Sequence, residues 1–173
     1  MRAFVLTRYG GPEVAELRDV PVPQPAAGEV QIAVKAAGLN PVDFKIREGK
    51  LKVINSYPLP IVLGCELSGV VTAVGAGVTR FRAGDDVYAR VAKDRLAAFA
   101  EVACVHEGFV AKKPASLDFI QAAALPLAAL TALQVLRDEL NVKPGWRLFI
   151  PGGAGGVGTF AIPLAKHLGA TVT

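Results

Sequence analysis

The apolar positions in the first 112 residues fall in short runs of β-branched and small side chains. Two of these runs are VQIAVKAAG and LSGVVTAVGAGV, and turn-forming segments rich in glycine, proline and aspartate bound them. A third stretch, FAEVACV, alternates apolar and polar positions, as a strand with one solvated face does. Short strands separated by such turns predict a closed or partly closed β-barrel.

The pattern changes near Pro114, after which alanine and leucine dominate the chain. Ser116 or Asp118 is placed to cap a helix there. Pro126 is expected to end this helix and to occupy the first turn of a second one, because proline has no amide hydrogen to donate inside a helix. The second helix should run to about Glu139.

The end of the chain has the pattern of a strand, a loop, a helix and a second strand. WRLFI is predicted to be a buried strand, a helix should span about 156–167, and GATVT opens another strand. This order is one βαβ unit. Pro163 lies within the expected helix, where it removes a backbone hydrogen bond at a cost of about 3 kcal/mol, so we expect a kink or a delayed helix start.

The segment between that strand and that helix, PGGAGGVG, carries the spacing G-x-G-x-x-G at 153–158. In dinucleotide-binding folds the first glycine allows a tight turn, the second lets backbone amides approach a pyrophosphate, and the third lets the helix pack closely. The positive end of the helix dipole then faces the phosphates. The predicted cofactor contacts here are Gly153, Gly155, Gly156, Val157 and Gly158. A tight turn that binds no ligand is the alternative.

The choice between NADPH and NADH stays open in this sequence. An acidic residue about twenty positions after the loop usually contacts the ribose 2′-hydroxyl of NADH, and a basic one the 2′-phosphate of NADPH. Counting that far from Gly153 reaches Thr173, the last residue.

Composition narrows the class of protein. The 173 residues are 52% apolar and 20% charged, which is typical of a soluble globular chain. The net charge of +4 comes from scattered lysines and arginines, so we expect neither a nucleic-acid patch nor a lipid patch. Proline and polar residues interrupt the alanine-rich stretch at 119–136, which favours a buried helix over a membrane span.

The cysteines and the N-terminal segment bear on localisation. Cys65 and Cys104 stand alone without a CxxC pattern, and MRAFVLTRYGG lacks the apolar core of a secretory signal. Two isolated cysteines are typical of a reduced intracellular protein rather than a disulfide scaffold. We therefore expect a cytoplasmic protein.

Four segments, taken in order, are similar to one known family. GGPEVAELRDVPVPQPAAGEVQIAVKAAGLNPVDFKIREG is followed by GCELSGVVTAVGAGVTRFRAGDDVYA, AAALPLAALTALQVL and GGAGGVG. Over essentially its whole length the chain resembles the N-terminal portion of the zinc-independent quinone oxidoreductase branch of the medium-chain dehydrogenase/reductase superfamily. The resemblance implies an α+β part followed by an α/β part: a GroES-like β-barrel catalytic domain at 1–115, then the first βαβ unit of an incomplete Rossmann domain at 116–173.

The resemblance also bears on metal binding. Zinc-dependent relatives place a cysteine and a histidine at the positions of Asn40 and Cys65, so we expect no metal site. Cys65 with Glu66 and a distant His106 is the remaining metal alternative, but the spacing does not indicate three or four converging ligands. Without a Lewis acid, hydride transfer suits an electron-poor acceptor such as a quinone or an α,β-unsaturated carbonyl compound.

The resemblance implies roles for four side chains. Asn40, Asp43 and Tyr57 are the candidate catalytic residues: Asn40 near the nicotinamide and substrate carbonyl, Asp43 holding the loop, Tyr57 lining the cleft or protonating an enolate. The Thr131 hydroxyl would face the nicotinamide. The alternatives are a turn and helix cap for Asn40 and Asp43, a packed loop for Tyr57, and a hydroxyl bonded back to its own helix for Thr131.

The predicted function is that of an NADPH-dependent reductase of quinones or enones, with NADH as the alternative cofactor. A non-catalytic member that binds a nucleotide or a partner is the main alternative, and Asn40 and Cys65 disfavour a zinc alcohol dehydrogenase. Complete members are longer and commonly homodimeric. The isolated chain is therefore expected to be inactive, to bind cofactor poorly, and to associate or lose order after about 150, with uncovered apolar helix faces at 118–138 and 156–167.

Overall fold

The computed structural model describes residues 1–173, which form two compact units at Met1–Ala124 and Leu125–Thr173. We predicted a boundary at 115/116, and the contacts instead divide the chain after Ala124. The difference arises because the short helix α2 (Phe119–Ala123) packs against strands of the first unit. The assignment of 1–115 and 116–173 as folding domains stays a prediction.

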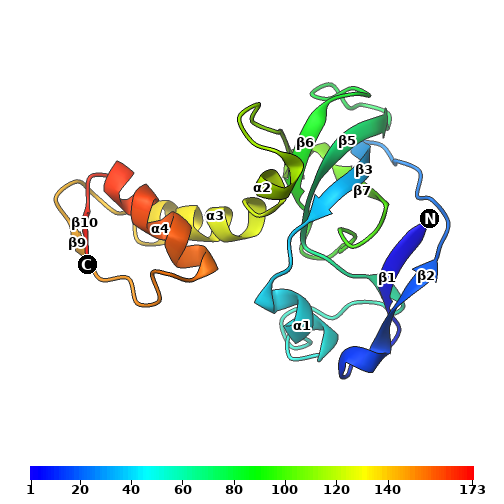
Figure 1. The fold of residues 1–173 in the computed structure, drawn as a ribbon, viewed down its shortest axis with the longest axis horizontal. Helices are drawn as coiled ribbons and strands as arrows, with labels where there is room; N and C mark the ends of the chain where they lie inside the picture. Colours follow the sequence, from blue (N-terminus) through cyan, green and yellow to red (C-terminus); the bar gives the residue numbers. More distant parts are fainter. The chain divides into compact units, whose positions relative to one another are not determined.

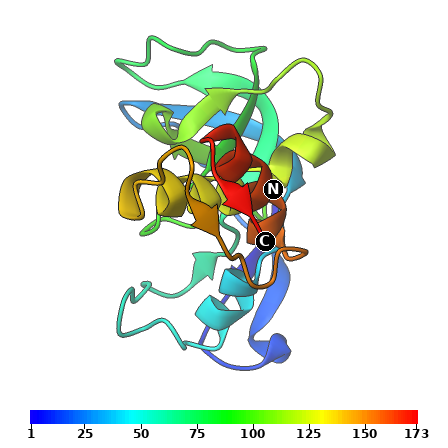
Figure 2. The same ribbon diagram turned by 90° about the vertical axis from the view of Figure 1, so that its left-hand side faces the viewer.

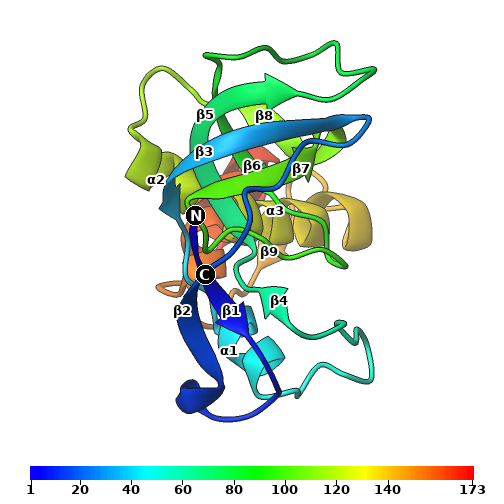
Figure 3. The same cartoon turned by 90° about the vertical axis from the view of Figure 1, so that its right-hand side faces the viewer.

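The first unit contains two antiparallel sheets (Figure 1). The larger sheet has the strand order β7-β3-β5-β6-β8 and the smaller one the order β2-β1-β4. The strands are β1 (Arg2–Leu6), β2 (Ala15–Asp19), β3 (Glu29–Ala37), β4 (Ile61–Val62), β5 (Glu66–Val74), β6 (Asp86–Arg90), β7 (Val102–His106) and β8 (Val110–Lys112). Figure 3 shows β7, β3 and β5 side by side in the larger sheet. The three apolar stretches noted in the sequence correspond to β3, β5 and β7.

The core of the first unit lies between the buried faces of these strands. The buried side chains include Val30 and Ile32 on β3 and Leu67 and Val71 on β5. Strand β1 of the smaller sheet is linked to the segment before β7, where the Phe4 amide donates to the carbonyl of Phe99 at 2.8 Å.

Short helices connect the strands. They are η1 (Pro12–Val14), α1 (Pro41–Arg47), η2 (Glu107–Phe109) and α2. Of the two predicted caps for α2, the structure uses Asp118: its side chain accepts the amide of Gln121 at 2.7 Å, and the Gln121 side chain accepts the amide of Asp118 at 3.1 Å. The buried hydroxyl of Ser68 donates to the Phe119 carbonyl at 2.5 Å, which fixes α2 against β5.

The second unit is the predicted βαβ unit preceded by helices. Its elements are α3 (Pro126–Leu133), the π-helical turn η3 (Gln134–Glu139), β9 (Arg147–Leu148), α4 (Gly156–His167) and β10 (Thr171–Val172). Strands β9 and β10 pair in parallel (Figure 2), and α4 packs on α3. The second helical segment ends at Glu139 as predicted, but its last six residues form a π-helix, which the sequence pattern did not indicate.

One prediction for the second unit is wrong, and one of the two alternatives given for Pro163 is excluded. The strand in WRLFI is only Arg147–Leu148, and it is not buried: Trp146 is 44% exposed and Phe149 78% exposed, because a two-stranded sheet has no further strand to cover them. Helix α4 is unbroken from Gly156 to His167 with Pro163 inside it, so its start is not delayed. A kink at Pro163 stays a prediction.

No helix of the structure is both long enough and apolar enough to cross a membrane.

Candidate active site and cofactor loop

Asn40 stands at the start of α1, where the chain leaves β3. Pro41 occupies the first helical position, and Asn40 is the capping residue before it. Oδ2 of Asp43 accepts the backbone amide of Asn40 at 2.8 Å, and the Asp43 amide donates to the Asn40 carbonyl at 3.0 Å. Asp43 therefore fixes the backbone of the capping residue, which is the helix-cap alternative noted for Asn40 and Asp43; a catalytic role for either residue stays a prediction.

A buried glutamate holds the side chain of Asn40. Nδ2 of Asn40 donates to Oε1 of Glu66 at 2.6 Å, and Glu66, the first residue of β5, is 2% exposed. A Cβ atom at Gly38 would lie 2.2 Å from Oε1 of Glu66 and 2.9 Å from the Ala123 carbonyl oxygen. Only glycine fits at position 38. Because Gly38 has no side chain, the Glu66 carboxylate can approach the end of β3.

Sequence reasoning missed this role of Glu66. We had considered Glu66 only as a remote metal-ligand alternative beside Cys65. The available signal was a lone carboxylate in the apolar run GCELSGVV, since charged residues are almost never fully buried unless they are paired.

The side chains of Cys65 and Asp43 lie next to each other, close to Asn40. Burial raises the pKa of Asp43, opposed by its hydrogen bond from Asn40, by the neighbouring Cys65 and by the positive charge of Arg90. Burial also raises the pKa of the Cys65 thiol, and the adjacent Asp43 carboxylate adds to this shift. The thiol is therefore protonated at neutral pH, and a protonated thiol is neither a nucleophile nor a metal ligand.

Arg90 supplies positive charge to this cluster from β6. It lies opposite Glu66 in the ladder between β5 and β6, and its guanidinium donates to the carbonyls of Cys65 and Val91. Its charge lowers the pKa values of both Asp43 and Cys65, without reversing the effect of burial.

Tyr57 is buried in the loop before β4. Its hydroxyl donates to the Lys93 carbonyl at 2.7 Å, and its amide donates to the Tyr9 hydroxyl at 3.0 Å. Burial raises its pKa. These contacts are those of the packed-loop alternative, in which the proton of Tyr57 is committed to a backbone carbonyl. A catalytic role for Tyr57 stays a prediction.

Thr131 lies on α3 in the second unit. Its hydroxyl is exposed and donates to the Leu127 carbonyl one turn earlier, at 2.7 Å. This is the alternative noted for Thr131, because such back-bonding satisfies a threonine inside its own helix. The hydroxyl oxygen keeps lone pairs that can accept a hydrogen bond, so its contact with a cofactor also stays a prediction.

The glycine loop has the geometry that its spacing requires. Gly152 adopts a φ of +73°, and the Gly155 amide donates to the Gly152 carbonyl at 2.8 Å to close the turn. A Cβ at Gly158 would lie 2.6 Å from the Gly152 carbonyl oxygen, so the third glycine is what allows α4 to approach the loop. A Cβ at Gly156 would meet no atom within 4 Å.

This loop fits a pyrophosphate. Gly155 caps α4 without a side chain, and the first amides of a helix have no acceptor within it. The amides of Gly156, Val157 and Gly158 are therefore available to an anion at the positive end of a 12-residue helix, with open space above Gly156.

Asn40 and Cys65, which occupy the places of zinc ligands, belong to the hydrogen-bonded cluster described above. No group of three or more histidine, cysteine, aspartate or glutamate side chains converges as a metal site would require. His106 instead caps η2, where its Nδ1 accepts the Gly108 amide at 3.1 Å.

The fold and these two sites define a class of protein. The family model described as Alcohol dehydrogenase GroES-like domain matches residues 26–115. The chain belongs to this family, within the quinone oxidoreductase branch of the medium-chain dehydrogenases/reductases, which confirms the predicted resemblance and fold class.

Individual relatives make the similarity specific. The NADPH-dependent alkenal/one oxidoreductase, chloroplastic, of Arabidopsis thaliana is 43% identical over 97% of this chain and 45% of its own length. The crystal structure of an alcohol dehydrogenase superfamily protein from Novosphingobium aromaticivorans has a TM-score of 0.92 at 41% identity, covering 99% of this chain and 52% of that one. Escherichia coli quinone oxidoreductase complexed with NADPH has a TM-score of 0.87 at 36% identity, covering 99% and 51%. The chain spans about half the length of the relatives it matches.

Proposed function

We propose that the protein is an NADPH-dependent reductase of quinones or α,β-unsaturated carbonyl compounds, acting by hydride transfer without zinc. The observation that carries the proposal is the geometry of the glycine loop. Gly158 lies close to Gly152, and the first amides of α4 have no acceptor within the helix and can bind a pyrophosphate. The names of relatives support NADPH over NADH, since one is NADPH-dependent and another was solved with NADPH.

Asn40 is the residue of the first unit that we assign to the substrate. One amide hydrogen of its Nδ2 is donated to Glu66, so the carboxylate fixes the orientation of the side chain. Because the amide group is planar, fixing the first hydrogen also fixes the direction of the second N–H of the same nitrogen. This N–H can donate to a substrate carbonyl oxygen as negative charge develops there. A preorganised donor of this kind needs no reorientation during the reaction.

The surroundings of Asn40 favour an acceptor that disperses charge by itself. NADPH, when bound, supplies the hydride. A neutral amide stabilises an oxyanion less than a metal ion does, so the substrate must delocalise the added electron pair, as quinones and enones do. The protonated thiol of Cys65 and the engaged carboxylates of Asp43 and Glu66 support zinc-free chemistry, because these groups are committed to one another.

The proposal is tested by following NADPH oxidation with a panel of quinones and enones, using the protein as its gene encodes it. Asn40→Ala is expected to lower kcat by about 100-fold, the cost of removing one oxyanion donor, while NADPH affinity is unchanged. Gln24→Ala, which removes an exposed amide in the first unit, is the matched control.

One result would count against the reductase assignment, and another against the role of Asn40. Tight NADPH binding without turnover of any acceptor would favour the non-catalytic, nucleotide-binding alternative. Full activity of Asn40→Ala would leave the reductase assignment standing and remove Asn40 from the site.

Three further properties belong to this proposal. We place the protein in the cytoplasm, supported by two free, buried cysteines that form no disulfide. We expect a homodimer in the complete protein and no nucleic-acid partner, since the cationic side chains are scattered. Cell fractionation and light scattering of the complete protein check the first two.

A further inference from the structure

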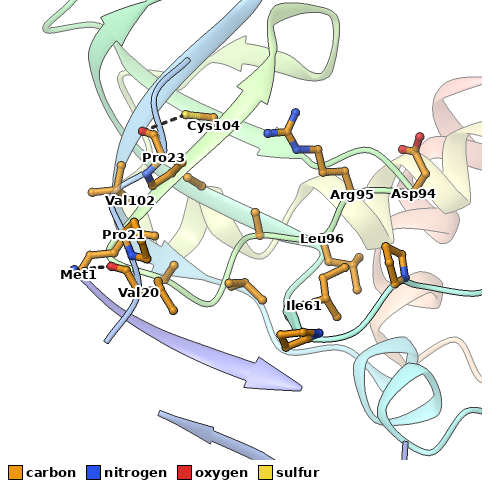
Figure 4. A pocket seen from close by; sticks show the side chains of 16 residues that line it. Met1, Val20, Pro21, Pro23, Ile61, Asp94, Arg95, Leu96, Val102 and Cys104 are labelled. Carbon is orange, nitrogen blue, oxygen red and sulfur yellow. Dashed lines mark hydrogen bonds between the residues drawn. The ribbon is translucent and has the colours of Figure 1, made fainter. Parts of the chain in front are cut away.

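A cavity of about 400 Å³ lies in the first unit (Figure 4). Its wall comes from the N-terminus, the proline-rich segment before β3, strand β4, the loop before β7, and β7 itself. Neither Asn40, Asp43 nor Tyr57 lines it. The volume falls within the range of small-molecule sites in proteins.

The wall is apolar and rigid over most of its area. Four prolines contribute to it, together with aliphatic side chains such as Ile61, Leu96 and Val102. Proline has a fixed φ and no amide hydrogen, so these segments offer a preformed surface with few donors. The thiol of Cys104 is also part of the wall; it donates to the Pro23 carbonyl at 3.5 Å, and burial raises its pKa to about 11. It is therefore a neutral part of the surface.

The two charged side chains of the cavity, Asp94 and Arg95, lie at one end of it. Figure 4 shows Arg95 and Asp94 on the opposite side of the cavity from Met1, Val20 and Pro21. Arg95 forms an ion pair with Glu29 through Nη1, and Glu29 is buried. A guanidinium carries five N–H donors, so this ion pair leaves donors of Arg95 for a further acceptor.

A second, smaller cavity of about 290 Å³ adjoins the first at this end. The two share Asp94, Arg95 and Cys104 in their walls. Arg95 therefore belongs to the walls of both cavities, and the buried carboxylate of Glu29 holds one edge of its guanidinium.

The local charges decide the kind of ligand. Arg95 is paired with Glu29, and the Met1 ammonium and Asp94 add one charge of each sign, so the wall has no excess charge to neutralise a charged ligand. A neutral molecule with one hydrogen-bond acceptor meets both the apolar wall and the spare donors of Arg95.

We propose that this cavity is a second ligand site, distinct from the site of hydride transfer, and that it takes an uncharged apolar carbonyl compound whose oxygen accepts from Arg95. The site requires no cofactor. Ligand binding in this cavity can therefore be tested independently of the proposed reductase activity.

The test uses benzophenone, a neutral apolar ketone that labels nearby C–H bonds on irradiation, with the protein in the absence of NADPH. Peptide mass spectrometry should place the label within 20–23, 58–62 or 94–104. Fluorenone, which keeps the carbonyl, should protect these peptides about tenfold better than fluorene, which lacks it, as expected for one hydrogen bond to a charged donor.

Three variants sharpen the result. Val102→Trp and Ile61→Trp fill the cavity from two different elements and should each abolish labelling of these peptides. Leu17→Trp, on the exposed face of β2, is the matched control and should leave it unchanged. Arg95→Lys keeps the positive charge beside Glu29 but loses the guanidinium fork, and it should abolish the preference for fluorenone over fluorene.

Each contrary outcome overturns the proposal. Label confined to the exposed apolar residues of the second unit, or to the segment around Asn40, would show that the cavity is not a site. Equal protection by fluorenone and fluorene in the wild type would remove the carbonyl requirement. Circular dichroism melting of each variant establishes that lost labelling reflects a filled cavity rather than an unfolded chain.

Discussion

At the scale of single residues, the candidate site is a set of side chains that restrain one another. Glu66 holds the amide of Asn40, Asp43 holds its backbone, and Gly38 leaves the space in which the Glu66 carboxylate sits. Cys65 packs beside Asp43 as a neutral thiol. The arrangement places a donor with a fixed direction at the start of α1.

Burial of Asp43 has a consequence for the pH dependence of stability. Because its pKa in the folded protein is raised above the ordinary value of 3.8, the folded state binds this proton more tightly than the unfolded state does. The contribution of Asp43 to stability is therefore most favourable below pH 3.8, and it declines as the pH rises through the raised value. Urea unfolding of the wild type and of Asp43→Asn across the acidic range should show this decline in their difference.

A variant at Asp138 should show the opposite dependence of stability on pH. The hydrogen bond from Arg137 lowers the pKa of Asp138, so the difference between the wild type and Asp138→Asn should rise slightly as the pH increases. If the Asp43→Asn difference were flat or rising as well, burial would not dominate at Asp43.

At the scale of elements, the glycine loop and α4 show what spacing can and cannot indicate. The pattern G-x-G-x-x-G predicted the turn, the helix after it and the close approach at Gly158, because each of these depends on neighbours in the sequence. The contact between Asn40 and Glu66 joins residues 26 positions apart on a helix start and a strand; the sequence around Glu66 indicates that its carboxylate needs a partner but does not indicate which one. The strand in WRLFI was predicted as buried from its composition, but burial depends on neighbouring strands rather than on the segment itself.

Two glycines of the loop provide a matched pair of variants. Gly158→Ala places a Cβ 2.6 Å from the Gly152 carbonyl oxygen and should destabilise the loop by about 1–3 kcal/mol. Gly156→Ala meets no atom, so thermal stability should be kept, while NADPH affinity falls because the methyl group fills the space above the free amides. Thermal melting and isothermal titration of the complete protein measure both, and equal melting losses in the two variants would contradict this reading of the loop.

At the scale of the whole molecule, the two units differ in how well they cover their apolar side chains. The first unit buries a cluster of apolar side chains whose strand residues all come from the larger sheet. The second has a small core around Ala132, Leu136 and Ala165, and leaves Trp146 and Phe149 exposed beside a two-stranded sheet. Exposed apolar clusters of this kind favour association.

Substitution of Phe149 tests this difference. Phe149 is 78% exposed, so Phe149→Gln should lower self-association of the purified chain. The melting temperature of the chain should not fall. Val53→Gln in the first unit is the control, since Val53 is fully exposed there, beside the exposed Ile54. Sedimentation velocity measures the effect, and an equal response of both variants would show that exposure alone, rather than the second unit, drives association.

The register of the larger sheet has a consequence for synthesis on the ribosome. Strand β3 pairs on one side with β5 and on the other with β7, whose last residue is His106. An emerging chain can form the β3–β5 ribbon early, but one edge of β3 stays open until β7 has left the exit tunnel. During that interval the unpaired edge of β3 is where a nascent chain of this protein is most exposed to mispairing, and where a chaperone would act.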